Sequence, residues 1–237
     1  NSGVITFNTA PDYETKTSYS VTVTVSDGTT DANQDLIISI TNLNDVSPVI
    51  SSLDTFNADE NQLSVGNVVA SDVEGDSLTY SLSGNDAGSL SISNSGVITF
   101  NTAPNYENKN TYSATLSVND GANPVSQNLV IDINDINDIP LIYSNSAFSA
   151  AENQTVVGTI IAEDEDGDSL NYTLRGTEAS LFSISDEGAL SFIAAPDYEI
   201  KNSYSLNVAV SDGELTNPQD LTINVTDVYE TYDVEVD

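Results

Sequence analysis

Apolar and polar side chains alternate in short runs along most of the chain. In residues 18–26, valines at every second position alternate with Ser and Thr, and residues 111–119 and 203–211 repeat this alternation. A period of two is typical of a β-strand with one face in a core and the other in solvent. No run has the spacing of an amphipathic helix. Further short strands are predicted in apolar runs at 68–71, 78–83, 90–93, 97–100 and 128–134.

Turn sequences rich in Gly, Asn, Asp and Ser separate these runs. Seven short strands within about 92 residues, with a turn every 8–12 residues or so, indicate an antiparallel β-sandwich. Val, Ile, Leu, Tyr and Phe are expected to face its interior, and Ser, Thr and Asn to face water. The predicted fold class is therefore all-β, with tandem seven-stranded antiparallel Greek-key sandwiches and no helices of note.

A long internal repeat determines the domain organisation. The opening residues NSGVITFNTAP, 1–11, return unchanged at 94–104, and ADENQ at 58–62 returns as AAENQ at 150–154. Such self-similarity at one period predicts stacked units of about 92 residues. The predicted parts are the second half of a repeat at 1–45 (repeat 1), whole repeats at 46–138 (repeat 2) and 139–227 (repeat 3), and a tail at 228–237.

Repeat 1 contains only three of the seven predicted strands, which are too few to close a core. We expect the chain to be a piece of a longer protein that begins in the middle of a repeat. The alternative is that another chain supplies the missing strands, giving a filament or oligomer by strand complementation. The tail is a candidate donor, since Tyr232, Val234 and Val236 would share one face of a strand.

Charge narrows the possible functions. The chain has 37 acidic residues against four Lys and Arg, a formal net charge of −33. This charge repels nucleic acids and anionic membrane surfaces and attracts cations. The absence of Cys and His excludes disulfides, thiol chemistry and the usual zinc ligands. No apolar run approaches the length of a membrane span, so membrane insertion is not expected.

The acidic residues are concentrated at strand ends and turns, at the same phase of each repeat. DVEGD at 72–76 and DEDGD at 164–168 show this equivalence. A general acidic coat, as in halophilic proteins, is the alternative, but it predicts acids along the solvent faces of strands. Those faces carry mostly Ser, Thr and Asn. The coat therefore does not account for acids that recur at the same positions of each repeat.

The order of the acidic motifs resembles tandem cadherin repeats of the bacterial or cadherin-like branch. No single motif is specific, but their order at one period is, and the resemblance covers nearly the whole chain. It implies Ig-like sandwiches that bind Ca²⁺ between successive repeats. The motifs are AAEN at 150–153, DEDG at 164–167, DYE at 197–199, SDG at 211–213 and the linker DIND at 135–138.

In that family, carboxylates from the facing ends of two repeats and from their linker bind calcium together. For the junction of repeats 2 and 3, the resemblance implies the ligands Glu60, Glu107, Asp135, Asn137, Asp138, Asp164, Asp166 and Asp212. For the junction of repeats 1 and 2, it implies Asp12, Glu14, Asn44, Asp45, Asp72, Glu74 and Asp120.

The sequence departs from the family pattern in several places. Asn42 stands where the linker has an Asp, Asn105 replaces the Asp of the DYE motif, and Glu74 replaces an Asp. The junction of repeats 1 and 2 is therefore expected to be the less complete. Asp76 and Asp168 lie beside the pattern without mapping onto it. An unfinished site is expected after repeat 3, at Glu152, Asp197, Glu199 and Asp227.

The physical chemistry agrees with this interpretation. Ca²⁺ takes six to eight oxygen ligands, roughly, at about 2.3–2.6 Å, whereas Mg²⁺ demands a stricter octahedron. Two carboxylates about 4 Å apart repel by roughly 4 kcal/mol at an effective dielectric of about 20. A junction holding several of them is therefore expected to need a cation. With calcium bound, successive repeats are expected to become rigid.

The sequence does not favour an enzyme. Paired carboxylates hydrolyse glycosides in a cleft, normally with aromatic residues, and the chain has no Trp. We expect Tyr13, Tyr106 and Tyr198 to be structural corner residues. The predicted function is a calcium-binding structural or adhesion module of a larger bacterial cell-surface protein, outside the cell, with other surface proteins, like repeats or glycans as partners. The alternative is an ancillary carbohydrate-binding module of a secreted polysaccharide-degrading enzyme.

Overall fold

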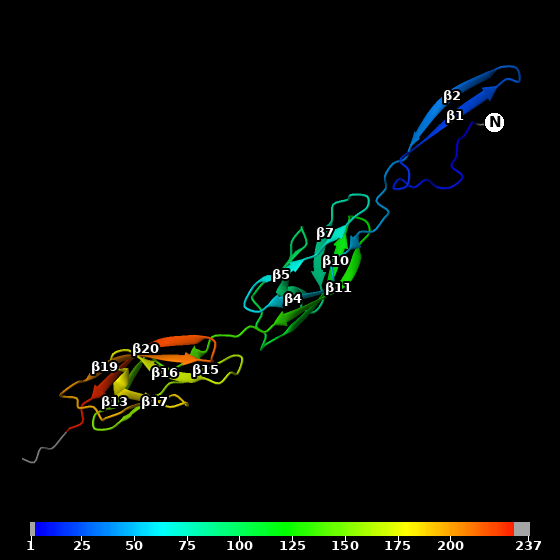
Figure 1. Ribbon diagram of the computed structural model, residues 1–237. Helices are drawn as coiled ribbons and strands as arrows, with labels where there is room; N and C mark the ends of the chain where they lie inside the picture. The colour runs from blue at the N-terminus through cyan, green and yellow to red at the C-terminus, as the bar shows by residue number, and fades with distance from the viewer. Residues whose placement is uncertain (1–2, 230–237) are drawn as a thin grey trace, which may run out of the picture. The chain divides into compact units, whose positions relative to one another are not determined.

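The computed structural model of the chain describes residues 3–229 (Figure 1). These fall into two compact parts, unit 1 up to residue 135 and unit 2 from residue 136. Each unit is described by itself. The tail residues suggested above as a donor strand, 232–236, lie outside the described residues.

Unit 1 holds a two-stranded sheet in repeat 1 and a sandwich in repeat 2. The strands of repeat 1 are β1 (Ser18–Ser26) and β2 (Asp31–Ser39). Those of repeat 2 are β3 (Val49–Ile50), β4 (Thr55–Asp59), β5 (Ser64–Asn67), β6 (Ala70–Ser71), β7 (Thr79–Ser83), β8 (Leu90–Ile92), β9 (Val97–Phe100), β10 (Thr111–Asn119) and β11 (Val125–Asn134).

Unit 2 holds a second sandwich with the same succession of elements. Its strands are β12 (Leu141–Ile142), β13 (Ala147–Ala151), β14 (Val156–Thr159), β15 (Ala162–Glu163), β16 (Asn171–Arg175), β17 (Phe182–Ile184), β18 (Ala189–Phe192), β19 (Ser203–Ser211) and β20 (Thr216–Thr226).

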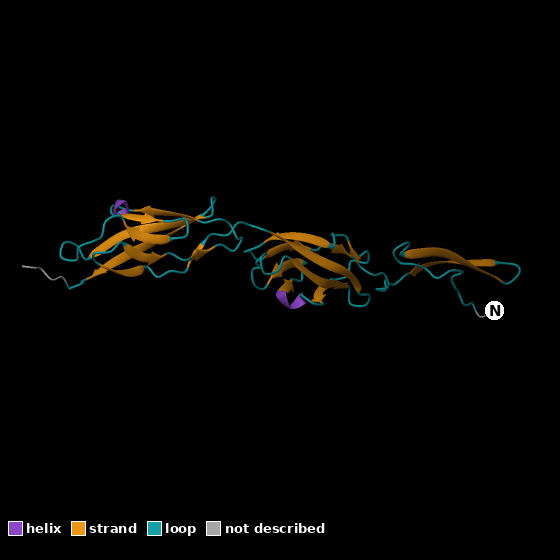
Figure 2. Ribbon diagram, turned by 90° about the horizontal axis from the view of Figure 1, so that it is seen from below, coloured by secondary structure: helices purple, strands orange, loops and turns teal. Residues whose placement is uncertain are grey.

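The all-β prediction is confirmed. Within the described residues the only helical segments are two short 3₁₀ turns, η1 (Ala87–Ser89) and η2 (Ala179–Leu181), drawn in purple in Figure 2. Neither approaches the length or apolar character that a helix needs to cross a bilayer. Three predicted strands, 18–26, 111–119 and 203–211, match β1, β10 and β19 residue for residue, because their alternation is uninterrupted.

Each whole repeat packs a four-stranded sheet against a three-stranded one. The sheet orders are β4-β11-β10-β7 and β5-β9-β8 in repeat 2, and β13-β20-β19-β16 and β14-β18-β17 in repeat 3. The first two strands of each sandwich are interrupted, so the pairs β3–β6 and β12–β15 are short additions. Counting each interrupted strand once gives the seven predicted strands.

One strand pair of each whole repeat departs from the antiparallel prediction. β4 runs parallel to β11, and β13 runs parallel to β20. The first strand pairs with one sheet through β3 and then, after its interruption, with the other sheet through β4. The last strand runs in the same direction as the first, so their pairing is parallel. The alternation of apolar and polar residues within a strand does not determine which strand it pairs with.

Repeat 1 also differs from the expectation of three strands. Residues 4–7 have the same sequence as β9 but form no strand. β9 lies between β5 and β8, and repeat 1 has no counterpart of either neighbour within the described residues. The side chains of Ile5 and Phe7 are accordingly 51% and 40% exposed, whereas those of Ile98 and Phe100 are 0% and 2% exposed.

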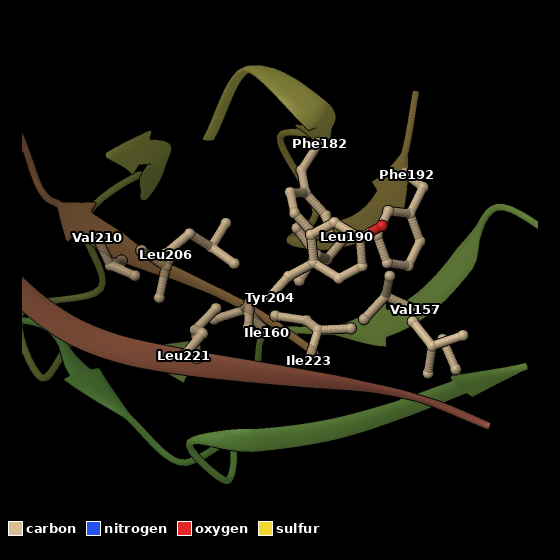
Figure 3. Close-up of a cluster of buried hydrophobic side chains, with 13 residues drawn as sticks. Val157, Ile160, Phe182, Leu190, Phe192, Tyr204, Leu206, Val210, Leu221 and Ile223 are labelled. Carbon is tan, nitrogen blue, oxygen red and sulfur yellow. The ribbon is translucent and has the colours of Figure 1, made fainter. Parts of the chain in front are cut away.

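The core of each sandwich is built from the inward positions of the alternating strands. In repeat 3, Phe182, Phe192 and Tyr204 pack edge to face or tilted, with ring centroids 4.4–5.8 Å apart (Figure 3). Leu221 and Ile223 of β20 pack in the same cluster. Burial of this apolar surface stabilises each sandwich and holds the acidic turns at its ends in place.

Candidate metal centres

The loop after β6 wraps around one carboxylate. Asp72 Oδ1 accepts hydrogen bonds from the backbone N–H groups of Glu74 (2.8 Å) and Asp76 (3.3 Å). Gly75 adopts φ +81°, a conformation that favours glycine and allows the loop to turn back. The DVEGD motif is therefore a closed turn that brings three acids together. Carboxylate oxygens of Asp72, Glu74 and Asp76 lie within 4.8 Å of one another.

Glu74 connects this loop to the linker between repeats 1 and 2. Its carboxylate accepts hydrogen bonds from the backbone N–H groups of Asp45 (3.1 Å) and Val46 (2.9 Å). Carboxylate oxygens of Glu14, Asp45 and Glu74 also lie within 4.8 Å of one another. The longer Glu74 thus reaches the linker, and the departure from Asp does not remove this residue from the cluster.

The NDG turn after β10 positions a further carboxylate against the linker. Asp120 is 6% exposed, and its Oδ1 accepts the backbone N–H groups of Ala122 and Asn123 at 2.7 and 2.6 Å. Burial raises the pKa of Asp120, but these N–H donors outweigh it and leave the pKa below its usual value. Asn44 donates to the carbonyl oxygen of Asp120 (3.2 Å). Asp120 is therefore an anion at neutral pH, held next to Asn44.

Neighbouring carboxylates affect the pKa of Glu14. Its own backbone N–H lowers the pKa of Glu14, but desolvation and the neighbouring Asp12 and Glu74 carboxylates raise it above its usual value overall. Asp12, by contrast, has a lowered pKa because Thr15 and Glu14 donate to it. Asp12 organises the turn, whereas Glu14 presents a carboxylate to two other acids. A divalent cation would stabilise that arrangement.

The far end of unit 1 gathers three more of the predicted ligands. Carboxylate oxygens of Glu60, Glu107 and Asp135 lie within 4.8 Å of one another. Glu60 is only 3% exposed, and its Oε2 accepts the backbone N–H of Tyr106 (2.8 Å). Asn61, the next residue, has φ +60°, which Asn tolerates better than most residues.

The start of unit 2 repeats the pattern of the first linker. Asp166 Oδ2 accepts the backbone N–H of Asp138 (2.7 Å), as Glu74 does for Asp45. Asn137 Nδ2 donates to Asp212 Oδ2 (3.0 Å). Desolvation raises the pKa of Asp212, but the donors Asn137, Leu215 and Glu214 leave it below its usual value.

The second carboxylate oxygen of two equivalent residues is the sharpest indication of a cation. Asp72 Oδ2 and Asp164 Oδ2 are buried and accept no hydrogen bond from any described residue. Asp72 and Asp164 occupy the same position in repeats 2 and 3. A buried anionic oxygen without a donor is costly, and the same atom is left so in both repeats. These residues therefore fit an oxygen-coordinated cation.

A further cluster lies at the end of repeat 3, where an unfinished site was expected. Carboxylate oxygens of Glu152, Asp197 and Glu199 lie within 4.8 Å of one another. Glu152 is 3% exposed and accepts the backbone N–H groups of Tyr198 (2.9 Å) and Val228 (2.8 Å). The Glu199 N–H lowers the pKa of Glu199, but desolvation and the carboxylates of Glu152, Asp227 and Asp197 raise it overall.

Two residues at these sites were not assigned from the sequence. Asp76 joins the cluster of Asp72 and Glu74, and its position just after the turn glycine was the available signal. Asn123 donates to Asn44 Oδ1 (2.8 Å) and so fixes the linker amide. No motif marks Asn123, because its role depends on how the loop after Asp120 folds.

The predicted ligands of the junction of repeats 2 and 3 fall in both units, and their joint site stays a prediction.

Comparison with known proteins finds a matching family model and similar sequences. A family model described as a bacterial Ig domain matches residues 44–132 and 137–224. Rat Cadherin-23 is 28% identical over 179 residues, which are 70% of this chain and 5% of that protein. Chitinase A of Pseudoalteromonas piscicida is 30% identical over 181 residues, which are 76% of this chain and 21% of that protein. The chain thus spans a small part of these relatives.

The fold comparison gives the same architecture. The crystal structure of human Protocadherin-24 EC1-2, form II, matches with a TM-score of 0.55 and 23% identity, and the match covers 78% of this chain and 100% of that chain. At this identity the likeness concerns the fold. It supports the assignment of the described sandwiches to a cadherin-like architecture.

Proposed function

Because the chain belongs to the bacterial Ig domain family and consists of tandem cadherin-like repeats, we propose that it is a calcium-binding structural or adhesion module of a larger extracellular protein. The matched domains are Ig-like and cadherin modules rather than catalytic domains. Its proposed partners are other surface proteins, repeats of the same kind, or glycans. The boundaries at 45, 138 and 227 remain part of this proposal.

The observation that carries the proposal is the pair of buried, donor-free oxygens Asp72 Oδ2 and Asp164 Oδ2. Each belongs to an acidic turn that also binds the backbone of a linker, through Glu74 or Asp166. Carboxylate, amide and carbonyl oxygens, with no nitrogen or sulfur ligand, suit calcium. The chain's own residues orient these oxygens, and the bound ion supplies the positive charge that offsets their repulsion.

A calcium titration followed by thermal unfolding tests the proposal. Binding to the folded state alone stabilises it by about 2.7 kcal/mol at a hundredfold excess over the dissociation constant. We expect saturable heats in calorimetry and a melting temperature that rises with Ca²⁺ and falls again with chelator. Mg²⁺ at the same ionic strength is the control and is expected to give a smaller shift. The absence of both heat and a chelator-sensitive shift would contradict the proposal.

A second candidate is a glycan-binding module of a secreted polysaccharide-degrading enzyme. The chitinase A match supports it, as does Tyr143 just after β12, which is 60% exposed, since an exposed tyrosine presents a broad apolar face with a polar tip to a ligand. If this function holds, the chain is retained on chitin and Tyr143→Ala is not. Tyr143→Phe, the matched control, keeps the ring and is expected to be retained. Equal retention of all three, or of none, would refute the role of Tyr143.

A further inference from the structure

Three of the four cationic side chains of the protein occupy one position of the repeat. Lys16, Lys109 and Lys201 each follow two residues after the Glu of a DYE or NYE motif. Each ammonium group lies over the ring of the tyrosine three residues later, with Nζ 4.4–4.7 Å from the ring centroid. A chain with 37 acidic residues thus places most of its positive charge beside these acidic turns.

In each whole repeat, an acid next to the 3₁₀ turn also holds the lysine. Lys109 pairs with Asp86, just before η1, and Asp86 Oδ2 accepts the backbone N–H of Ser113 in β10 (2.8 Å). The carboxylate is therefore attached to the strand, and the ammonium group is held between it and the Tyr112 ring. Repeat 3 makes the same contacts with Glu in place of Asp, since Glu178 pairs with Lys201 and accepts the N–H of Ser205 (2.7 Å).

The ring beneath each of these two lysines packs against the core of its sandwich. Tyr112 meets Phe100 edge to face, with ring centroids 4.9 Å apart. Tyr204 packs in the same way against Phe182 and Phe192 (Figure 3). Close-packed rings of this kind have little freedom to move. The lysine therefore connects the acidic turn before it to a rigid part of the sandwich.

The turn that carries Glu107 is attached at both of its ends. At its start, the backbone N–H of Tyr106 donates to the buried carboxylate of Glu60 (2.8 Å). At its end, the backbone N–H of Lys109 donates to the carbonyl oxygen of Asn105 (3.0 Å). Glu107 lies between these two attachments, and its carboxylate belongs to the cluster that contains Glu60. The place of Glu107 in that cluster thus depends on both ends of the turn.

We propose that Lys109 is a positioning residue for a cation site at Glu107, and that Lys201 has the same role for Glu199. Its ion pair and its ring contact hold the turn so that the glutamate is directed at its cluster before a cation binds. This arrangement lowers the cost of ordering the turn on binding. The inference rests on the proposed calcium function. Long-range electrostatics alone predicts the opposite effect, since an ammonium group repels Ca²⁺ and its removal would strengthen binding.

Amide exchange of the full, isotopically labelled chain in chelator tests the positioning by itself. Lys109→Met keeps the length of the side chain and removes its charge. It is expected to speed exchange of the Tyr106 and Asn108 amides, which donate to Glu60 and Asn105, about fivefold or more. Lys109→Arg keeps a charge that can pair and stack, and is expected to retain the parental rates. Lys16→Met, the same change in another turn, is the matched control and leaves both amides unchanged.

A calcium titration followed through the Glu107 amide signal tests the consequence for binding. Lys109→Met is expected to weaken calcium binding about threefold to tenfold, as for a residue that orients a metal ligand, and Lys109→Arg to restore it. The double variant Lys109→Met with Asp86→Asn has the parental net charge. It is expected to bind as weakly as Lys109→Met alone, because the two side chains act as one pair.

The inference is overturned if Lys109→Met leaves exchange in the turn unchanged, or if Lys109→Arg exchanges as fast as Lys109→Met. It is also overturned if Lys109→Met binds calcium as tightly as the parent or more tightly, which is the result that charge repulsion alone predicts. A parent chain that does not respond to calcium contradicts the proposed function instead, and the exchange rates in chelator then still decide whether Lys109 positions the turn.

Discussion

At the level of single residues, the two oxygens of Asp72 have separate tasks. Oδ1 closes the turn by accepting N–H groups from Glu74 and Asp76, and Oδ2 is buried without a donor. Substitution by Asn keeps a carbonyl oxygen for the turn and removes the negative charge. The fold and the cation site can thus be separated at this one position.

Asp72→Asn is expected to bind calcium about tenfold or more weakly than the unaltered chain, a loss of about 1.4 kcal/mol or more. Its unfolding in chelator is expected to stay within about 0.5 kcal/mol of the parent, because the turn keeps its acceptor. Calorimetric titration and chemical unfolding measure the two effects. Asp54→Asn, an exposed acid outside the clusters, is the control, and an equal loss of affinity in both variants would contradict the assignment.

At the level of elements, local pattern determined what could be predicted. β10 and β19 were predicted to the residue because alternation continues along their whole length. The parallel partner of β4 was not predicted, since it depends on the path of the chain between sheets. Residues 4–7 carry the sequence of β9 yet form no strand, because a strand forms only beside a partner.

The candidate sites show the same division. The resemblance assigned Asp72, Glu74 and Asp120 as candidate ligands because the DVEGD and NDG turns that carry it are local and recur, but it left Asp76 unassigned. The reach of Glu74 to the linker and the contact of Asn123 with Asn44 depend on how two separate loops meet. Residue type alone, a Glu in place of an Asp, suggested a weaker site. In the structure, the longer side chain of Glu74 accepts a hydrogen bond from the linker backbone, as the shorter Asp166 does in unit 2.

At the level of the whole molecule, stability at low pH depends on the few lysine side chains. Hydrogen bonding from Lys109 lowers the pKa of Asp86, and hydrogen bonding from Lys201 lowers the pKa of Glu178. A carboxyl with a lowered pKa in the folded state stabilises the fold above its unfolded pKa, and this contribution is lost as the pH falls through the folded value. The relevant window begins near the ordinary values of 4.5 for Glu178 and 3.8 for Asp86 and extends below them.

The unfolding midpoint in urea, followed by circular dichroism in chelator, is therefore expected to fall as the pH is lowered from about 5 to 3. Lys109→Ala and Lys201→Ala reduce the midpoint at the higher pH and flatten this fall, because the lysine no longer favours the charged carboxylate. Lys16→Ala is the matched control, since Lys16 has no ion pair among the described residues, and its slope is expected to equal that of the parent. If Lys16→Ala flattens the acid limb as much as the other two variants, or if none does, general repulsion among the acids rather than these ion pairs controls acid unfolding.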